Sequence, residues 1–401
     1  MYKQLKILTT GRKEDMAKKT VKVKDQAEEY TGTADSEKKK RIDDCLKSIQ
    51  NKFDKGCIML LGAQPIKKMP VTSTGVFPID AALTIGGIPK GRICEFFGPE
   101  GGGKTTVALY SIAACQKAGG VAAFLDVEQT LDPNLAVSCG VRLEELIFSQ
   151  PDNANQMLTM AEQLILSDAV DLLVIDSVAA MVTESEMEGT LGESAAKIGE
   201  LARLMSSSLR KLVNLSSKHG TTIIFINQIR QNINTGYGHG PTETTPGGRA
   251  LKFYSSVRLE VKRGKQIKKG EEVVGHELFV KVVKNKMAPP FKTAHCSLIY
   301  GEGIPEDLCI VDMATDKGVL KRKGSWIVYK GETIAQGRDA MANLLKEKPE
   351  LRDAIKKEIM DVIGQGFTAA EGDLLEEDDD TLSYDVLLNA DGSEAEEDSI
   401  D

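Results

Sequence analysis

One stretch of the chain combines the residue types and the spacing of a phosphate-binding loop. Residues 98–106 read G-P-E-G-G-G-K-T-T, which fits the pattern G-x-x-x-x-G-K-[ST]. An apolar run over 93–97 precedes the loop, and a segment of helical composition, 107–118, follows it. Glycines let the backbone turn several N–H groups inward, and such a loop at the start of a helix binds phosphate groups. The sequence therefore predicts a nucleoside triphosphate site.

Two side chains of this loop have the chemistry for specific roles. Lys104 is expected to reach the β- and γ-phosphates of ATP, and the Thr105 hydroxyl to be a ligand of Mg²⁺. A glycine-rich turn without a ligand is the alternative, and the combination of strand, glycines, lysine and threonine argues against it. The nucleotide-binding set expected in the loop is Gly98, Pro99, Glu100, Gly101, Gly102, Gly103, Lys104, Thr105 and Thr106.

Polar side chains also follow three other predicted strands. The apolar run 171–176 ends in Asp176, and Glu128 closely follows the run 121–126. Because parallel strands end at one edge of a sheet, Asp176 is predicted to hold Mg²⁺ beside the loop. Glu128 is the candidate for polarising the attacking water, with capping of a helix by its segment as the open alternative. Gln228, at the end of a fourth strand, is placed to sense a γ-phosphate.

The order of the predicted elements indicates an α/β fold. Strands alternate with helices from about 92 to 227, which is typical of a mostly parallel, twisted sheet with helices on both faces. The expected strands are 93–97, 121–126, 146–149, 171–177 and 221–227, and the expected helices are 39–53, 107–118, 153–167 and 198–217. Further strands are expected at 257–262 and 278–283, on either side of a basic hairpin (263–269), and at 296–300. A small α/β module follows, with a helix at 306–315, strands around 326–329 and helices from 338.

Two polar, glycine-containing segments lie next to the predicted nucleotide site. Residues 184–197 come after the strand that ends in Asp176, and residues 231–249 come after Gln228. Loops of this length inside a compact domain are usually functional or disordered. We therefore expect them to bind a ligand whose affinity depends on ATP.

The net charge of −8 conceals an asymmetry. Residues 358–401 contain 16 Asp and Glu and no Lys or Arg, so that residues 1–357 carry a net charge of +8 once these negative charges are removed. A basic body with an acidic tail suits a polyanionic partner for which the tail competes. A solvated tail that only improves solubility remains the alternative.

Composition divides the chain into five expected parts. Seven scattered cysteines without a C-x-x-C pair are typical of a cytoplasmic protein, and no apolar run approaches the ~18–20 residues that cross a bilayer. The four histidines show no metal-ligand spacing. The expected parts are a disordered basic extension (1–38), an N-terminal helical segment for polymerisation (39–66), an ATPase core (67–304), a small C-terminal domain (305–366) and an acidic disordered tail (367–401).

Several motifs together resemble one family. They are S-T-G at 73–75, the loop at 98–106, V-I-D-S-V-A-A at 174–180, F-I-N-Q-I-R at 225–230, G-G-R-A-L-K-F-Y at 247–254 and K-V-V-K-N-K-M-A-P-P-F-K at 281–292. From about residue 39 to 364 the chain is similar to the bacterial RecA family of homologous-recombination ATPases. It departs from the family pattern at Gly101 and Gly102, usually serines, at Leu135, usually aromatic, and at Tyr237, often phenylalanine. The first polar segment is about two residues longer.

The resemblance implies a RecA-like ATPase core and a set of residue roles. Glu128 would be the catalytic carboxylate, Gln228 the γ-phosphate sensor and Asp132 a contact to adenine. Lys284 and Lys286, which alternate with Val283 and Asn285 and so share one face of a strand, would reach the ATP of a neighbouring subunit. Residues 184–197 and 231–249 would be DNA-binding loops. The implied DNA contacts are Arg203, Arg210, Asn227, Ile233, Gly247 and Gly248, and Phe253 would lie in the subunit interface.

The implied activity is that of a DNA-dependent ATPase that forms a filament on single-stranded DNA. It would pair this strand with homologous duplex DNA, exchange strands and stimulate self-cleavage of an SOS-type repressor, with ATP and Mg²⁺ as cofactors. Two alternatives stay open. A hexameric helicase on the same fold would form closed rings, and a regulatory ATP-binding protein would not turn ATP over.

Overall fold

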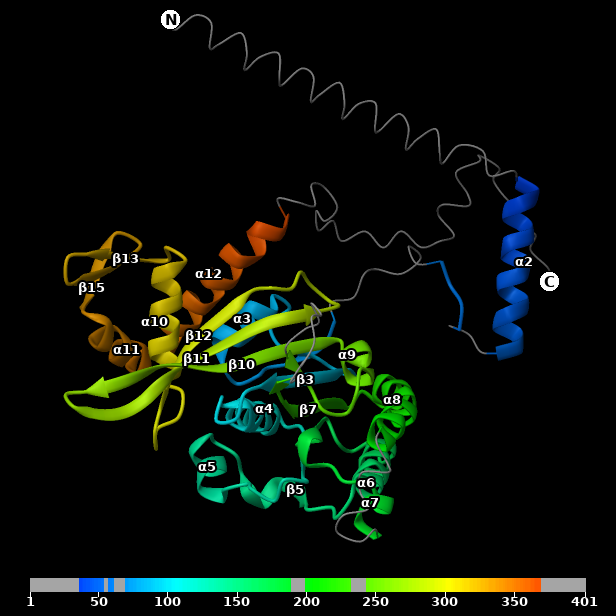
Figure 1. Cartoon of the computed structure of the whole chain (residues 1–401). Helices are drawn as coiled ribbons and strands as arrows, with labels where there is room; N and C mark the ends of the chain where they lie inside the picture. Colours follow the sequence, from blue (N-terminus) through cyan, green and yellow to red (C-terminus); the bar gives the residue numbers. More distant parts are fainter. Residues whose placement is uncertain (1–35, 54–56, 61–68, 189–198, 232–242, 369–401) are drawn as a thin grey trace, which may run out of the picture. The chain divides into compact units, whose positions relative to one another are not determined.

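The computed structural model describes residues 36–53, 57–60, 69–188, 199–231 and 243–368 (Figure 1). The described residues belong to two units, of which the first, up to Lys68, contains helix α2 (Ser36–Phe53). This helix begins three residues before the expected start, and its apolar side chains Ile42 and Phe53 are exposed within the unit. The second unit, from Met69, contains all the other elements that the structure describes.

An eight-stranded sheet forms the centre of the second unit (Figure 1). Its strand order is β12-β11-β10-β3-β7-β6-β4-β5, and every neighbouring pair from β10 to β5 is parallel. The strands are β3 (Ile93–Gly98), β4 (Ala122–Asp126), β5 (Leu146–Ser149), β6 (Leu172–Asp176), β7 (Thr222–Gln228), β10 (Val257–Lys269), β11 (Glu272–Asn285) and β12 (Thr293–Ile299). The predicted fold class is confirmed.

Helices cover both faces of the sheet, as the near-continuous apolar strands require. Along β6, Leu172 and Val174 pack with α4 (Lys104–Lys117) in one cluster, whereas Leu173 and Ile175 pack with α6 (Ala154–Leu166) and α8 (Glu200–His219) in another. Successive side chains of a strand point to opposite faces, which explains this division. The parallel sheet is therefore buried between two apolar layers, and a polar site can form only at the ends of its strands.

A smaller module follows the sheet in the same unit. A three-stranded antiparallel sheet, β13-β14-β15, packs with three helices around a separate apolar cluster. Its elements are α10 (Glu306–Asp316), β13 (Leu320–Lys323), β14 (Trp326–Tyr329), β15 (Glu332–Gln336), α11 (Arg338–Glu347) and α12 (Pro349–Thr368). The expected helix at 306–315 and strand at 326–329 are confirmed, and β13 and β15 are added.

Short elements connect these layers. They are β1 (Val71–Thr72), α3 (Phe77–Leu83), β2 (Ile88–Pro89), α5 (Pro133–Ser138), η2 (Leu143–Glu145), η3 (Val178–Ala180), α7 (Glu184–Glu188), β8 (Arg230–Gln231), β9 (Glu243–Thr244) and α9 (Ala250–Tyr254). No helix in the described ranges is long and apolar enough to cross a membrane.

Three expectations about loops need correction. The segment expected as a loop from 184 begins as helix α7, because Thr183 caps it through contacts with Glu186. The second segment, 231–249, contains β9, which pairs with β8 in a two-stranded ribbon at the start of the segment. The basic stretch 263–269 belongs to β10, since its backbone pairs with β11 as far as Lys269 and Glu272. Ile233 and Tyr237 lie outside the described residues.

Candidate functional site

The phosphate-binding loop connects β3 to α4 at the carboxyl edge of the sheet. Gly101 and Gly103 have φ angles of 65° and 90°, a region that favours glycine. A Cβ atom on Gly98 would lie 2.0 Å from the Val261 carbonyl oxygen of β10, so that any side chain would displace the neighbouring strand. The glycines therefore permit both the turn of the loop and its close approach to the sheet.

Lys104 is the first residue of α4 and is buried within the loop. Its Nζ donates a hydrogen bond of 2.7 Å to the Pro99 carbonyl oxygen. Burial lowers the pKa of this ammonium group, although Asp176, Glu128 and Glu100 act in the opposite direction. The charge is thus held inside the turn, where phosphate oxygens would compete with one backbone carbonyl for it.

Thr105 and Asp176 meet beside this loop, although 71 residues separate them in the chain. The Thr105 hydroxyl donates to Asp176 Oδ2 at 2.7 Å. Asp176 is 3% exposed, and burial raises the pKa of its carboxyl group to about 6, against the opposing effect of the Thr105 hydrogen bond. A hydroxyl and a carboxylate in contact are hard oxygen donors, so the pair fits a Mg²⁺ ion.

Glu128 and Gln228 complete the polar edge. Gln228 pairs in parallel register with Gly98, and its Nε2 donates to Glu128 Oε1 at 3.2 Å. The capping alternative is not supported, because α5, the helix that follows, is capped by Asp132. The Asp126 carboxylate instead accepts hydrogen bonds from the N–H groups of Thr130 and Leu131 in the connecting loop. Glu128 is therefore free of that role and faces the phosphate sensor expected at Gln228.

Asp132 has a structural contact of its own. Its carboxylate accepts a hydrogen bond of 2.8 Å from the Asn134 N–H and thereby caps α5. The side chain is exposed, as is the neighbouring Leu135, at 37%. The expected contact of Asp132 to adenine stays a prediction.

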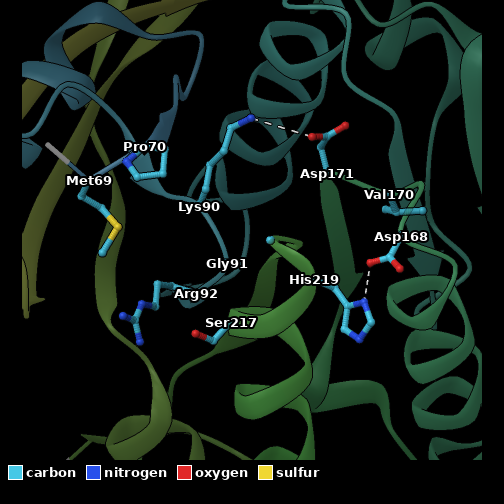
Figure 2. Close-up of a pocket in the computed structure, with 11 residues that line it drawn as sticks. Met69, Pro70, Lys90, Gly91, Arg92, Asp168, Val170, Asp171, Ser217 and His219 are labelled. Atoms are coloured by element: carbon cyan, nitrogen blue, oxygen red, sulfur yellow. Dashed lines mark hydrogen bonds and ion pairs between the residues drawn. The ribbon is translucent and has the colours of Figure 1, made fainter. Parts of the chain in front are cut away.

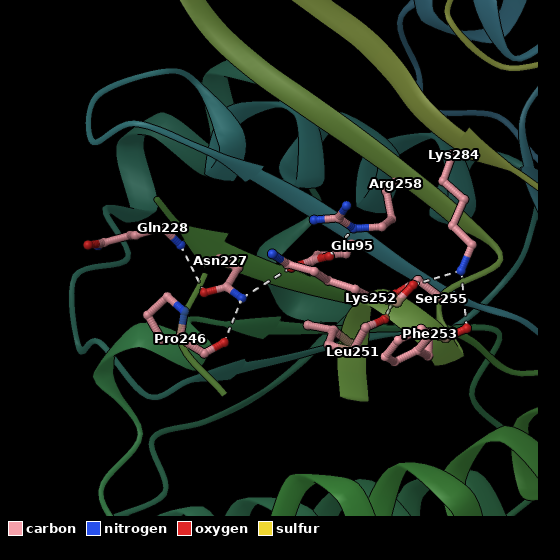
Figure 3. Close-up of polar contacts among 10 residues, drawn as sticks. All are labelled: Glu95, Asn227, Gln228, Pro246, Leu251, Lys252, Phe253, Ser255, Arg258 and Lys284. Atoms are coloured by element: carbon pink, nitrogen blue, oxygen red, sulfur yellow. Dashed lines mark hydrogen bonds and ion pairs between the residues drawn. The ribbon is translucent and has the colours of Figure 1, made fainter. Parts of the chain in front are cut away.

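Lys284, near the end of β11, and Lys286, just after it, both point to the Phe253 carbonyl group, as the prediction that they share one side requires. Lys284 Nζ donates to the carbonyl oxygens of Lys252 and Phe253 at 2.7 and 3.1 Å, and Lys286 Nζ lies 3.4 Å from the Phe253 oxygen. Both ammonium groups thus lie at the last turn of α9, where carbonyl groups lack helical partners. Figure 3 shows the contacts of Lys284. Phe253 itself is 69% exposed.

The residues expected to contact DNA divide into exposed and buried ones. Arg203 and Arg210 are exposed on α8. Gly247 and Gly248 have φ angles of 79° and 77°, and Cβ atoms on them would approach Val178 and Ala202 to 2.7 and 2.9 Å. Asn227 differs from the expectation, because its side chain is fully buried and bonded within the protein.

A separate pocket of about 450 Å³ lies at the opposite, amino edge of the parallel strands (Figure 2). Its wall carries an ion pair, Lys90 with Asp171 at 3.8 Å, and a hydrogen bond between His219 and Asp168. Arg92 lines the same pocket. None of these residues was expected to be functional.

Comparisons with known proteins match almost all of the described chain. A family model for the RecA N-terminal domain matches residues 40–305, and one for the RecA C-terminal domain matches residues 308–366. The chain belongs to the RecA family. Membership makes it a DNA-dependent ATPase of recombination and DNA repair.

Relatives of this RecA-family protein are similar over nearly their whole length. It is 48% identical to Protein RecA of Macrococcus caseolyticus over 86% of this chain and 96% of the relative. It is 44% identical to Protein RecA of Bifidobacterium breve over 96% of both chains. It is 49% identical to Protein RecA of Rubrobacter xylanophilus over 82% of this chain and 95% of that relative.

Sequence reasoning missed a buried charge next to the site. Glu95, in the middle of β3, is 0% exposed and pairs with Arg258 of β10. A charged residue inside an otherwise apolar strand, I-C-E-F-F, was the available signal, because a buried charge needs a partner.

Proposed function

We propose that the carboxyl edge of the sheet hydrolyses ATP and controls DNA binding in a filament on single-stranded DNA. The observation that supports this most directly is the position of Gln228. It lies beside Gly98 of the phosphate loop, contacts Glu128, and comes just before the segment 231–249. One strand end therefore joins the nucleotide site to a proposed DNA-binding loop.

Each residue of the edge has a role in the proposed reaction. Lys104 would neutralise charge on the β- and γ-phosphates, and Thr105 and Asp176 would hold Mg²⁺, which when bound supplies charge neutralisation between the phosphates. Glu128 would accept a proton from the attacking water, and Gln228 would bind the γ-phosphate. The loop N–H groups from 98 to 106 would orient the nucleotide, with Asp132 at the base.

We further propose that Lys284 and Lys286 act on the ATP of a neighbouring subunit. Among the described residues of one chain, they bind carbonyl groups of α9, next to the exposed Phe253. Two cations on one strand face suit a γ-phosphate presented from outside, as arginine fingers do. A mixing experiment tests this role. A Lys284→Ala/Lys286→Ala protein and a Lys104→Ala protein, each inactive alone, should recover some DNA-dependent hydrolysis together; no recovery in mixtures that co-assemble on DNA contradicts it.

The proposed polymer is a helical filament that places single-stranded DNA against the segments 184–197 and 231–249. Arg203 and Arg210 would bind phosphates, Ile233 would insert between bases, and Gly247 and Gly248 would allow close backbone approach. Homologous duplex DNA and an SOS-type repressor are the proposed further partners, and the cytoplasm is the proposed location. The parts expected from composition, with a polymerisation segment at 39–66 and a competing acidic tail at 367–401, fit this assembly.

A D-loop assay tests the whole proposal. Purified protein with ATP, Mg²⁺, single-stranded DNA and a homologous supercoiled duplex should form joint molecules, and a heterologous duplex is the control. Phosphate release without joint molecules, together with closed rings in electron micrographs, would favour the helicase alternative. Bound ATP without DNA-stimulated phosphate release would favour the regulatory alternative.

A further inference from the structure

A buried polar network lies between the nucleotide edge and the second proposed DNA loop (Figure 3). Glu95 of β3 is its centre: one carboxylate oxygen accepts from the Asn227 amide at 3.1 Å, and the other accepts from Arg258 Nε. The Arg258 guanidinium also stacks over the Phe97 ring, 4.2 Å from its centroid. A buried carboxylate is tolerated here because both of its oxygens have donors.

Asn227 uses its amide to connect three segments. Its Nδ2 donates to Glu95 and also to the Pro246 carbonyl oxygen at 3.2 Å, while its Oδ1 accepts from the Gln228 N–H at 3.0 Å. Glu95 decides the orientation of this amide, because a flipped amide would place its oxygen against the carboxylate. The correct orientation then supplies a donor to Pro246 and an acceptor to Gln228.

We propose that Asn227 and Glu95 are positioning residues that couple ATP hydrolysis to DNA binding. The side chain of Asn227 ties Pro246, just after β9, to the backbone of Gln228, and Glu95 with Arg258 fixes the tie. A change at the phosphate sensor, Gln228, is thereby transmitted to the end of the proposed DNA loop. DNA binding at that loop is transmitted to Gln228 in the same way. This inference rests on the proposed function, in which Gln228 senses phosphate and residues 231–249 bind DNA.

The alternative is that the network only stabilises the sheet. A buried ion pair is weak evidence for such a role, because the desolvation of both charges offsets their attraction. The bond to Pro246 also leaves the sheet and reaches a connecting segment, which packing of β3, β7 and β10 does not require. The two roles predict different results when the amide of Asn227, and with it the bond to Pro246, is removed.

Asn227→Ser removes that bond without adding charge, since a serine hydroxyl is too short to bridge both acceptors. We expect the DNA concentration for half-maximal stimulation of hydrolysis to rise about tenfold, the usual scale of one buried hydrogen bond. Gln116→Ser is the matched control. Gln116 is 2% exposed and bridges the N–H and carbonyl of Arg142 at 2.9 Å each, away from this network. Wild-type DNA coupling in Asn227→Ser, or equal loss in both variants, overturns the inference.

Exchange of the amide at 227 with the carboxylate at 95 distinguishes an effect on stability from an effect on the coupling of ATP hydrolysis to DNA binding. Asn227→Asp places two carboxylates together, and Glu95→Gln leaves an amide donor facing either the Asn227 amide or the Arg258 guanidinium, so each variant should lower the thermal midpoint. In the double variant, the amide at 95 donates to the carboxylate at 227, and we expect most of the midpoint to return. The bond to Pro246 stays absent, so DNA coupling should stay weak. Recovery of both properties in the double variant overturns the inference.

Measurements on the wild-type protein distinguish a failure of the proposed function from a failure of the positioning role. Failure of DNA to stimulate wild-type hydrolysis would contradict the proposed function itself. Stimulation in the wild type and unchanged stimulation in Asn227→Ser would contradict only the positioning role. Circular dichroism and the thermal midpoint of Asn227→Ser, beside those of Gln116→Ser, establish that both variants are folded when the comparison is made.

Discussion

The two ends of strand β6 each carry an aspartate, and their surroundings are opposite. Asp171, just before the strand, has a side chain that is 41% exposed, contacts Lys90 and accepts a hydrogen bond of 3.0 Å from the Val121 N–H. Asp176, at the other end, is 3% exposed and accepts from Thr105. Burial raises the pKa of Asp176 to about 6. Five positions along one strand separate a solvated ion pair from a desolvated acid.

The difference shows which edge of the sheet has charges that a bound ligand could still stabilise. At the amino edge, water and a lysine already satisfy the negative charge, so a new ligand would gain little from it. At the carboxyl edge, the carboxylate is buried beside a lysine that is itself bonded to the Pro99 carbonyl. A bound cation and phosphate would stabilise both charges there, which makes this edge the reactive one.

Among the variants that test this difference between the two edges, Lys104→Ala should have the largest effect on ATP hydrolysis. Removal of one cation that neutralises charge on the transferred phosphoryl group is expected to lower hydrolysis by ~10²-fold or more. Phosphate release with saturating ATP and single-stranded DNA measures it, and Lys90→Ala at the amino edge is the control. Near-normal turnover in Lys104→Ala would place the reactive edge elsewhere.

Asp176→Asn should also impair hydrolysis, by roughly 10- to 100-fold, because an amide is a poorer partner for Mg²⁺ than a carboxylate. A part of the loss should return at high Mg²⁺ concentration. Hydrolysis is measured as a function of Mg²⁺, and an unchanged dependence on the ion would argue against the proposed ligand role.

The stability of the nucleotide-free, Mg²⁺-free protein should depend on pH through Asp176. Its pKa rises from 3.8 to about 6 on folding, so the folded state binds more protons between these values. The stabilising contribution is fully present below about pH 3.8 and is lost as the pH rises through about 6. Asp176→Asn should therefore gain about 3 kcal/mol over the wild type at pH 8 and little near pH 4. Denaturant unfolding of the variant and the wild type at both pH values measures this difference. Asp80, whose pKa is also raised to about 6, is present in both proteins, so its contribution cancels.

Asp171→Asn should have the smallest effect. The amide oxygen can still accept the Val121 N–H, and only a half-exposed ion pair is lost, which contributes less than about 1 kcal/mol to the free energy of unfolding. Hydrolysis should stay within about twofold of the wild type. A pH-dependent gain like that of Asp176→Asn would mean that the two ends of β6 do not differ as described.

The sequence by itself determined the parts that depend on local pattern. The glycines, Lys104 and Thr105 define the loop within nine residues, and apolar runs define the strands that lead to it. Alternation predicted that Lys284, near the end of β11, and Lys286, just after it, lie on one side, and both contact the Phe253 carbonyl group. The position of the Asp176 carboxylate beside the phosphate loop followed from the rule that parallel strands end at one edge of a sheet.

Only the tertiary structure decided which distant groups share a hydrogen bond. Glu95 meets Asn227 and Arg258 across 132 and 163 residues, and the order of β10, β3 and β7 in the sheet brings them together. The extension of β10 through basic residues likewise depends on backbone pairing with β11, which no side-chain pattern records. Local pattern specifies an element and its faces, whereas the neighbours of a buried polar group depend on strand order and register, and these are set by the packing of the whole sheet.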